Sequence, residues 1–193
     1  GIVGAAYPAV LASLGFIVVA PDYLGMRGWT GESEDLHAYV GSEPTAILSI
    51  DSLRALPNII STYNKDVTFD PDQIIVWGAS EGGFASLNTD RYFPHYAPEY
   101  TTIATIASTP VTDPLALGQR GVSIFSPTSA GVIGVELTLN QWYEVNADPV
   151  TMLQPEFTNI QDILYESCDD FGDIREVETL EEAFQQEFID GIL

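Results

Sequence analysis

A seven-residue stretch near the middle of the chain holds the side chain best suited to do chemistry. Residues 77–83 read Trp-Gly-Ala-Ser-Glu-Gly-Gly and contain the pattern Gly-x-Ser-x-Gly, with Ser80 at its centre. In this pattern the serine lies in a sharp turn between a strand and a helix, so that its hydroxyl projects as a nucleophile. The pattern fixes only three positions, and its value as evidence therefore depends on a strand before it and a helix after it.

Small residues around the serine are what such a turn requires. Gly78 and Gly82 would let the backbone approach closely at the turn, and Gly83 would let the following helix pack tightly. The backbone N–H of Glu81, at the start of that helix, would help to stabilise an oxyanion. The alternative is a Gly-Ser turn without chemistry. We therefore expect nucleophilic catalysis at Ser80, provided that a base activates its hydroxyl.

The segments around this motif have the pattern of an α/β fold. Three short apolar runs bounded by turn formers are expected to be buried strands: Gly15 to Pro21, Gln73 to Trp77 and Thr101 to Ala107. A helix is expected after Pro44, because apolar residues recur on one face through Leu56. Another helix would begin at Gly82 and stop at Pro94. This alternation predicts a parallel sheet with flanking helices.

The second part of the chain is richer in Gly, Ser, Thr and Pro. We expect a partial core over residues 1–114 and a largely helical cap over residues 115–193. Thr179 and Glu182 form a Thr-x-x-Glu capping box, which predicts the start of a last helix. An apolar set in the cap is expected either to be ordinary core or to line an acyl-binding pocket: Phe125, Val132, Ile133, Leu137, Leu139 and Trp142.

The charge of the chain excludes several partners. Its 193 residues include 28 Asp and Glu against 6 Lys and Arg, for a formal charge of -22. So few cations make nucleic acid an unsuitable partner, because a phosphate backbone is bound by neutralising it. No apolar run reaches the roughly 18 residues of a transmembrane helix. The 46% hydrophobic content is enough to bury a core.

Cysteine and acidic residues do not predict a metal site. Cys168 is the only cysteine, which excludes an internal disulfide and any multi-cysteine zinc or iron-sulfur centre. It lies close to Asp169, Asp170 and Asp173, but this spacing does not match an EF-hand loop and no histidine is near. We expect a solvated acidic loop there and no metal. The cluster Gly31 to Asp35 is expected to be another such loop.

Three sequence runs resemble the α/β-hydrolases: GFIVVAPDY at 15–23, DPDQIIVWGASEGG at 70–83 and IASTPVTDP at 106–114. Within that superfamily the chain is most similar to the secretory lipases and esterases related to Candida lipase A. This narrower likeness is carried by HAYVGSEPTAILSIDSLRAL at 37–56 and YAPEYTTIATIASTPVTDPLAL at 96–117. It covers roughly residues 5–140.

The resemblance implies a role for the residues of the motif. Ser80 would be the nucleophile of a carboxylic ester hydrolase, and Glu81 would supply one oxyanion-hole amide. The substrate would be a small-molecule ester or a lipid, and no metal or organic cofactor would be needed.

The chain also departs from the family pattern. In this fold the nucleophile is followed by an acid and then by a histidine, yet no histidine follows His95. An upstream strand with a His-Gly loop, which would give the second oxyanion donor, is not found either. We therefore expect an internal segment of the fold, with about three strands and the cap. Its remaining parts would lie in another chain or in a longer parent.

Two histidines and several aspartates are the candidate partners of Ser80. His37 follows the first expected strand, at the edge where loops line an active site, and is a candidate base. His95 is expected on the wrong side of the sheet. Asp113 follows the third expected strand and is a candidate acid, with a turn before Pro114 as the alternative. Turn formation is the expected role of the remaining aspartates: Asp22, Asp70 and Asp72.

Other interpretations stay open from the sequence alone. A peptidase of the prolyl oligopeptidase type also suits Gly-Ala-Ser-Glu-Gly-Gly. A non-catalytic chain that binds a partner through its cap would explain why no base is evident. The acidic composition is compatible with a secreted protein or with a halophilic cytoplasm.

Overall fold

The computed structural model describes residues 2–26, 37–63, 66–123, 127–143, 145, 149–157 and 178–192. Backbone contacts divide the chain into two compact units. Unit 1 comprises residues 1–23 and 42–110, and unit 2 comprises residues 24–41 and 111–193. The expected division near residue 114 keeps 24–41 with the core, whereas the contacts group these residues with unit 2.

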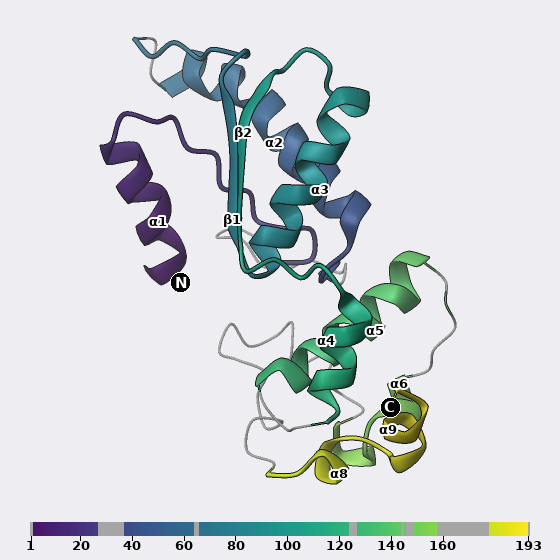
Figure 1. The fold of residues 1–193 in the computed structure, drawn as a ribbon. Helices are drawn as coiled ribbons and strands as arrows, with labels where there is room; N and C mark the ends of the chain where they lie inside the picture. The colour runs from purple at the N-terminus through teal and green to yellow at the C-terminus, as the bar shows by residue number, and fades with distance from the viewer. Residues whose placement is uncertain are drawn as a thin grey trace. The chain divides into compact units, whose positions relative to one another are not determined.

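A small parallel sheet forms the centre of unit 1. Strand β1 (Ile74–Ala79) pairs with strand β2 (Thr102–Ser108), with Ala79 opposite Ser108 at the carboxyl end. Both strands coincide closely with two of the expected runs. Helices α2 (Ser42–Tyr63) and α3 (Glu81–Tyr96) lie on one side of the strands and α1 (Ile2–Ser13) on the other (Figure 1). The expected α/β class is confirmed for the part of the chain that the structure describes.

Helix α2 (Ser42–Tyr63) confirms the helix expected after Pro44 and extends it past Pro57. Its apolar face includes Ala46 and Ile50, both fully buried. Ile50 packs in a core cluster with Ile74, Phe93 and Ala97. Packing of this apolar face in the core, rather than helix propensity, therefore holds α2 in place within unit 1.

A single arginine ties α2 to the end of α3. The guanidinium of Arg54 donates to Glu99 Oε1 at 2.7 Å, to Asp51 Oδ1 at 3.0 Å and to the Tyr96 carbonyl at 2.6 Å. It also lies over the Tyr96 ring, 4.6 Å from its centre. The hydrogen bond from Arg54 to Glu99 holds the pKa of Glu99 below its usual value. The network links α2 to the carboxyl end of α3.

Helix α3 (Glu81–Tyr96) follows β1 after a single residue. The expectation that it stops at Pro94 is wrong, because the helix continues two residues further. Pro94 lacks a backbone N–H and so cannot close one turn, but the cap is completed when the Ala97 N–H donates to the Phe93 carbonyl at 2.9 Å. Phe93 is buried in the core beneath that last turn.

The expected strand at Gly15 to Pro21 is not formed among the described residues. Helix α1 (Ile2–Ser13) is followed by a turn at Gly15, whose φ of 97° suits a position just after a helix. Residues 16–23 then form no strand within the described part of the chain, and Phe16 is 50% exposed. A strand needs a partner for its backbone groups, so an apolar run alone does not make one.

Unit 2 is helical. After residues 24–41 it contains α4 (Pro114–Gly121), α5 (Pro127–Tyr143), α6 (Pro149–Met152) and the short 3-10 turn η1 (Pro155–Phe157). Helix α5 packs closely on Tyr39: a Cβ added to Gly134 would lie 3.1 Å from that ring. Val132 is buried, in agreement with the expected apolar set. Phe125 and the side chains of Ile133 and Leu137 lie outside the described residues.

The last expected helix is present as two pieces, α8 (Leu180–Ala183) and α9 (Gln186–Ile192). The capping box is confirmed, with the Thr179 N–H donating to Glu182 Oε2 at 3.2 Å. Between the pieces Phe184 forms a bridge with Leu153, and both side chains are fully buried. The pairing of Phe184 with Leu153 separates α8 from α9 and buries the Phe184 ring.

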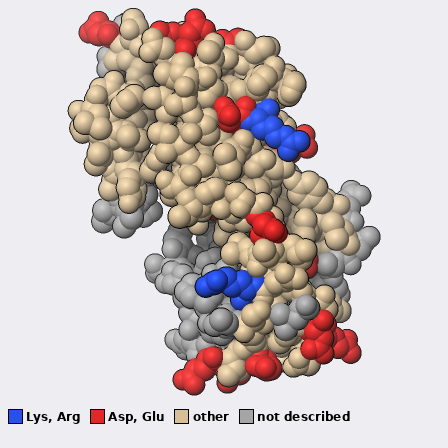
Figure 2. All heavy atoms as spheres, viewed as in Figure 1, with Lys and Arg blue, Asp and Glu red and all other residues tan. Residues whose placement is uncertain are grey.

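Acidic side chains are scattered over the surface, and few basic ones accompany them (Figure 2). Within the described residues, no helix is long and apolar enough to cross a membrane. The acidic run at 31–35 lies outside those residues.

We expect Ile50→Ala to lower the free energy of unfolding by about 2–5 kcal/mol, because it empties a fully buried site in the unit 1 core. Urea denaturation followed by circular dichroism would measure it. Ile59→Ala, on the same helix at a side chain that is 51% exposed, is the control and should change stability by less than about 0.5 kcal/mol. Equal effects of the two variants would contradict this account of the core.

Candidate functional site

Ser80 occupies the sharp turn between β1 and α3. The strand ends at Ala79 and the helix begins at Glu81, so Ser80 alone makes the connection. Its φ of 56° and ψ of -117° lie outside the regions that residues with a Cβ normally adopt. The residue is exposed at the carboxyl end of the strand. This is the strand, turn and helix context that the sequence motif required.

The glycines of the motif differ in what they do. A Cβ on Gly78 would lie 2.0 Å from the carbonyl oxygen of Gly82, so the two sides of the turn meet there. A Cβ on Gly83 would lie 2.7 Å from the carbonyl oxygen of Ser108, where α3 passes β2. A Cβ on Gly82 would meet nothing within 4 Å. The close approach thus depends on Gly78 and Gly83, and on the backbone rather than the missing side chain of Gly82.

The backbone N–H of Ser80 donates to the carbonyl oxygen of Ser108 at 2.9 Å. This bond continues the ladder between the strands by one rung beyond Ala79. The N–H of Ser80 is therefore already hydrogen-bonded to β2. The next backbone amide is that of Glu81, the first residue of α3. Backbone N–H groups at the start of a helix lack helical partners and can stabilise a negative charge.

Tyr23 lies near the motif, but the sequence did not identify this tyrosine as a candidate site residue. Burial, and secondly the negative charge of Glu81, raise the pKa of Tyr23 to about 12. The side chain is half-buried, whereas the adjacent Asp22 is exposed. A tyrosine two residues after the apolar run at 15–21 was the available signal, but its nearness to Glu81 depends on the tertiary fold.

The candidate base His37 belongs to unit 2 and is buried there. Its Nδ1 lies 3.3 Å from the carbonyl oxygen of Leu24, and its ring meets Tyr39 edge-on at 6.0 Å. Its own carbonyl oxygen accepts from the Thr138 hydroxyl at 3.5 Å. These contacts give the histidine a packing role within unit 2.

The remaining candidates have structural roles. Asp113 caps α4, because its Oδ1 accepts from the Ala116 N–H at 2.9 Å. His95 is exposed in the last turn of α3, about 22 Å along the helix from Ser80 at 1.5 Å per residue. Asp70 accepts from the Asp72 N–H at 3.0 Å in the turn before β1, as expected.

No metal site is evident in the part of the chain that the structure describes, where no group of three or more His, Cys, Asp or Glu is suitably placed. The acidic cluster of Cys168, Asp169, Asp170 and Asp173 lies outside the described residues.

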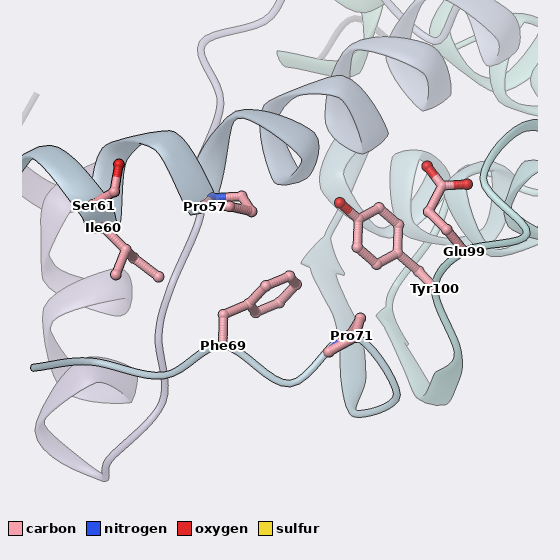
Figure 3. Close-up of a pocket in the computed structure, with 7 residues that line it drawn as sticks. All are labelled: Pro57, Ile60, Ser61, Phe69, Pro71, Glu99 and Tyr100. Carbon is pink, nitrogen blue, oxygen red and sulfur yellow. The ribbon is translucent and has the colours of Figure 1, made fainter. Parts of the chain in front are cut away.

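An open hollow of about 740 Å³ lies at the other end of the strands (Figure 3). The rings of Phe69 and Tyr100 face it, 6.0 Å apart between their centres. Both residues precede the amino ends of the strands, whereas Ser80 follows the carboxyl end of β1, a strand of six residues or about 20 Å. The hollow is therefore distant from Ser80, which does not line it. Its lining is largely apolar: Pro57, Ile60, Ser61, Phe69, Pro71, Glu99 and Tyr100.

Comparison with known proteins identifies relatives of the chain. The sequence profile of the secretory lipases matches residues 7–140. No match was found among curated protein sequences. A candidate hydrolase from Legionella pneumophila has a similar structure, with a TM-score of 0.76 at 21% identity over 96% of this chain and 50% of that one. The rice cell wall degrading esterase LipA from Xanthomonas oryzae gives a TM-score of 0.63 at 16% identity, over 84% and 46% of the two chains.

These matches bear on two expectations. The resemblance to secretory lipases is confirmed, and the likeness to the two solved structures supports the fold. The chain spans about half the length of the solved structures that it matches. The roles of individual residues, Ser80 included, stay predictions.

We expect Gly78→Ala to destabilise the protein by about 3 kcal/mol, the upper part of the usual range for overpacking, since two backbones would have to separate. Gly82→Ala is the matched control, because its Cβ enters open space. Thermal unfolding of the two variants measures the difference. A Gly78→Ala variant as stable as Gly82→Ala would contradict the close approach.

Stability should fall between pH 10 and about 12. In this interval the unfolded chain loses the Tyr23 proton while the folded chain retains it, so the unfolded state binds fewer protons. Glu81→Gln should lower the pKa of Tyr23, although burial would keep it above 10. Absorbance titration of tyrosinate, taken as a difference from Tyr23→Phe, measures the pKa, and Tyr63→Phe at an 84% exposed site is the control. An unchanged pKa in Glu81→Gln would contradict the proximity of the two groups.

Proposed function

This chain belongs to the secretory lipase family, and from that premise we propose that the protein hydrolyses carboxylic esters through an acyl-enzyme at Ser80. The observation that carries the proposal is the strained conformation of Ser80 between β1 and α3, with φ of 56° and an exposed position at the carboxyl end of the strand. Such a turn presents a serine hydroxyl to a substrate and leaves a helix start beside it.

The reaction follows from this arrangement. The Ser80 oxygen attacks the ester carbonyl carbon while a base takes the hydroxyl proton, and the carbonyl oxygen becomes an oxyanion. The Ser80 amide is held by Ser108, so we assign one oxyanion donor to the amide of Glu81. The alcohol then leaves with a proton, and water releases the acid from the serine in a second, similar step.

The base and the acid are proposed to lie beyond the 193 residues. His37 packs on Leu24 and Tyr39, and Asp113 caps a helix, so each has a structural role in unit 2. The coverage of about half of each matched structure supports this assignment. No metal or organic cofactor takes part in the proposed chemistry.

The substrate is proposed to be a small-molecule ester or a lipid, and the protein is proposed to act outside the cell. The family description as secretory supports the location. A charge of -22 also keeps a protein hydrated and dispersed in such a setting.

We expect Ser80→Ala to reduce hydrolysis of a short-chain nitrophenyl ester by the complete protein at least about 1000-fold, because the attacking oxygen is lost. A fluorophosphonate should label the unmodified protein at Ser80 and leave the variant unlabelled. Ser61→Ala, at a serine beside the distant hollow, is the control and should retain full activity. Unchanged ester hydrolysis by Ser80→Ala would refute the proposed function.

A further inference from the structure

Three consecutive residues at the end of β2 contact both sides of the Ser80 turn; we call residues 108–110 the elbow bracket. On the strand side, the Ser108 carbonyl accepts the Ser80 N–H at 2.9 Å. On the helix side, Pro110 packs on Gly83 so closely that a Cβ there would lie 3.1 Å from the Pro110 Cα. One tripeptide thus contacts the residue at the turn and the helix three residues beyond it.

The middle residue of the bracket is strained. Thr109 has φ of 44°, in the left-handed region that a β-branched residue rarely adopts. This conformation ends β2 directly after the last rung and turns the chain so that Pro110 reaches Gly83. Two strained non-glycine residues, Ser80 and Thr109, therefore follow paired positions of adjacent strands, since Ala79 lies opposite Ser108.

Burial of the threonine side chain does not explain this strain, because Thr109 is exposed. The conformation of Thr109 instead sets the direction of the backbone, which brings Pro110 against Gly83. A residue with a branched Cβ also has fewer backbone states than glycine, so once held in this well it moves less. Strained residues of this kind gather at functional sites, where surrounding structure holds them.

We propose that Thr109 is a positioning residue for the nucleophile, which acts through the Ser108 carbonyl and Pro110 to hold the Ser80 hydroxyl in its attacking position. This rests on the proposed function of Ser80. It assigns to the loop after β2 a part in the reaction without contact between Thr109 and the substrate. A shift of the nucleophile by about 1 Å can cost about 100-fold in rate, so a loosened bracket should be visible in kcat.

Three substitutions separate the backbone role from other roles. Thr109→Gly accepts the left-handed conformation without strain but leaves it free to move. Thr109→Asn also tolerates that conformation and keeps a Cβ. Thr109→Val keeps the branched shape and removes the hydroxyl. Each variant is measured in the complete protein for kcat and KM on nitrophenyl acetate, for the rate of fluorophosphonate labelling, for thermal stability and for hydrogen exchange of the Ser80 amide.

The proposal expects Thr109→Gly to be as stable as the unmodified protein or more so, yet to lose about 10- to 100-fold in kcat with KM unchanged. Its Ser80 amide should exchange faster. Thr109→Asn and Thr109→Val should keep kcat within about threefold, a small change beside the loss expected from a misplaced nucleophile.

Several results would overturn it. If Thr109→Gly has the same kcat and the same exchange rate of the Ser80 amide as the unmodified protein, the bracket does not position Ser80. A fall in stability that accompanies the fall in kcat would indicate a structural role only. A loss of kcat in Thr109→Val would indicate that the hydroxyl contacts substrate instead. If the unmodified protein is not labelled at Ser80, the proposed function fails, while amide exchange in Thr109→Gly still decides whether the bracket holds the turn.

Discussion

The backbone of Ser80 is in a conformation that an isolated chain would leave, and the described contacts of unit 1 oppose that tendency. A φ of 56° at a residue with a Cβ persists only where its surroundings determine it on several sides. Here the sides are the Gly82 backbone against Gly78, the β2 carbonyl that receives the Ser80 amide, and the passage of α3 over Gly83. Remove any of these contacts and a more relaxed turn becomes available.

The rest of unit 1 holds these contacts from a distance. Helix α3 cannot slide along β1, because its far end is fixed by Phe93 and Ala97 in the core. Arg54 adds a polar link from α2 to the same end through the Tyr96 carbonyl and Glu99. Core packing therefore sets the direction of the helix, and the glycines let its first turn come close to the sheet. The position of Ser80 at the carboxyl end of β1 therefore depends on packing near the amino end of the strand.

The sequence predicted the elements that depend on local pattern. Glycine spacing around Ser80 gave the turn, and the apolar periodicity after Pro44 gave α2. It did not predict the role of Thr109, because a positive φ at threonine contradicts local preference and arises only when β2, α3 and the turn are assembled. It also did not predict that His37 is buried against Tyr39, since that contact joins residues through tertiary packing.

Two sequence expectations failed for physical reasons of the same kind. The run at Gly15 to Pro21 has the composition of a strand, but composition supplies no hydrogen-bonding neighbour. Pro94 has the character of a helix stop, yet its missing N–H falls in a last turn that is closed by the next residues. In both cases the outcome depends on which backbone N–H and carbonyl groups find hydrogen-bond partners. The type of a residue does not specify those partners.

The apolar side of the sheet that faces α1 has an optical consequence. Trp77 is 41% exposed, stands three residues before Ser80 and meets the Tyr7 ring at 5.6 Å between centres. Indole emission moves to shorter wavelength when water leaves its surroundings, and a nearby phenol is an energy donor to it. The protein therefore has an intrinsic fluorophore close to its candidate nucleophile. Trp29 and Trp142 also contribute to the emission, so the difference in emission wavelength from a Trp77→Phe variant would report how much water reaches this side of β1.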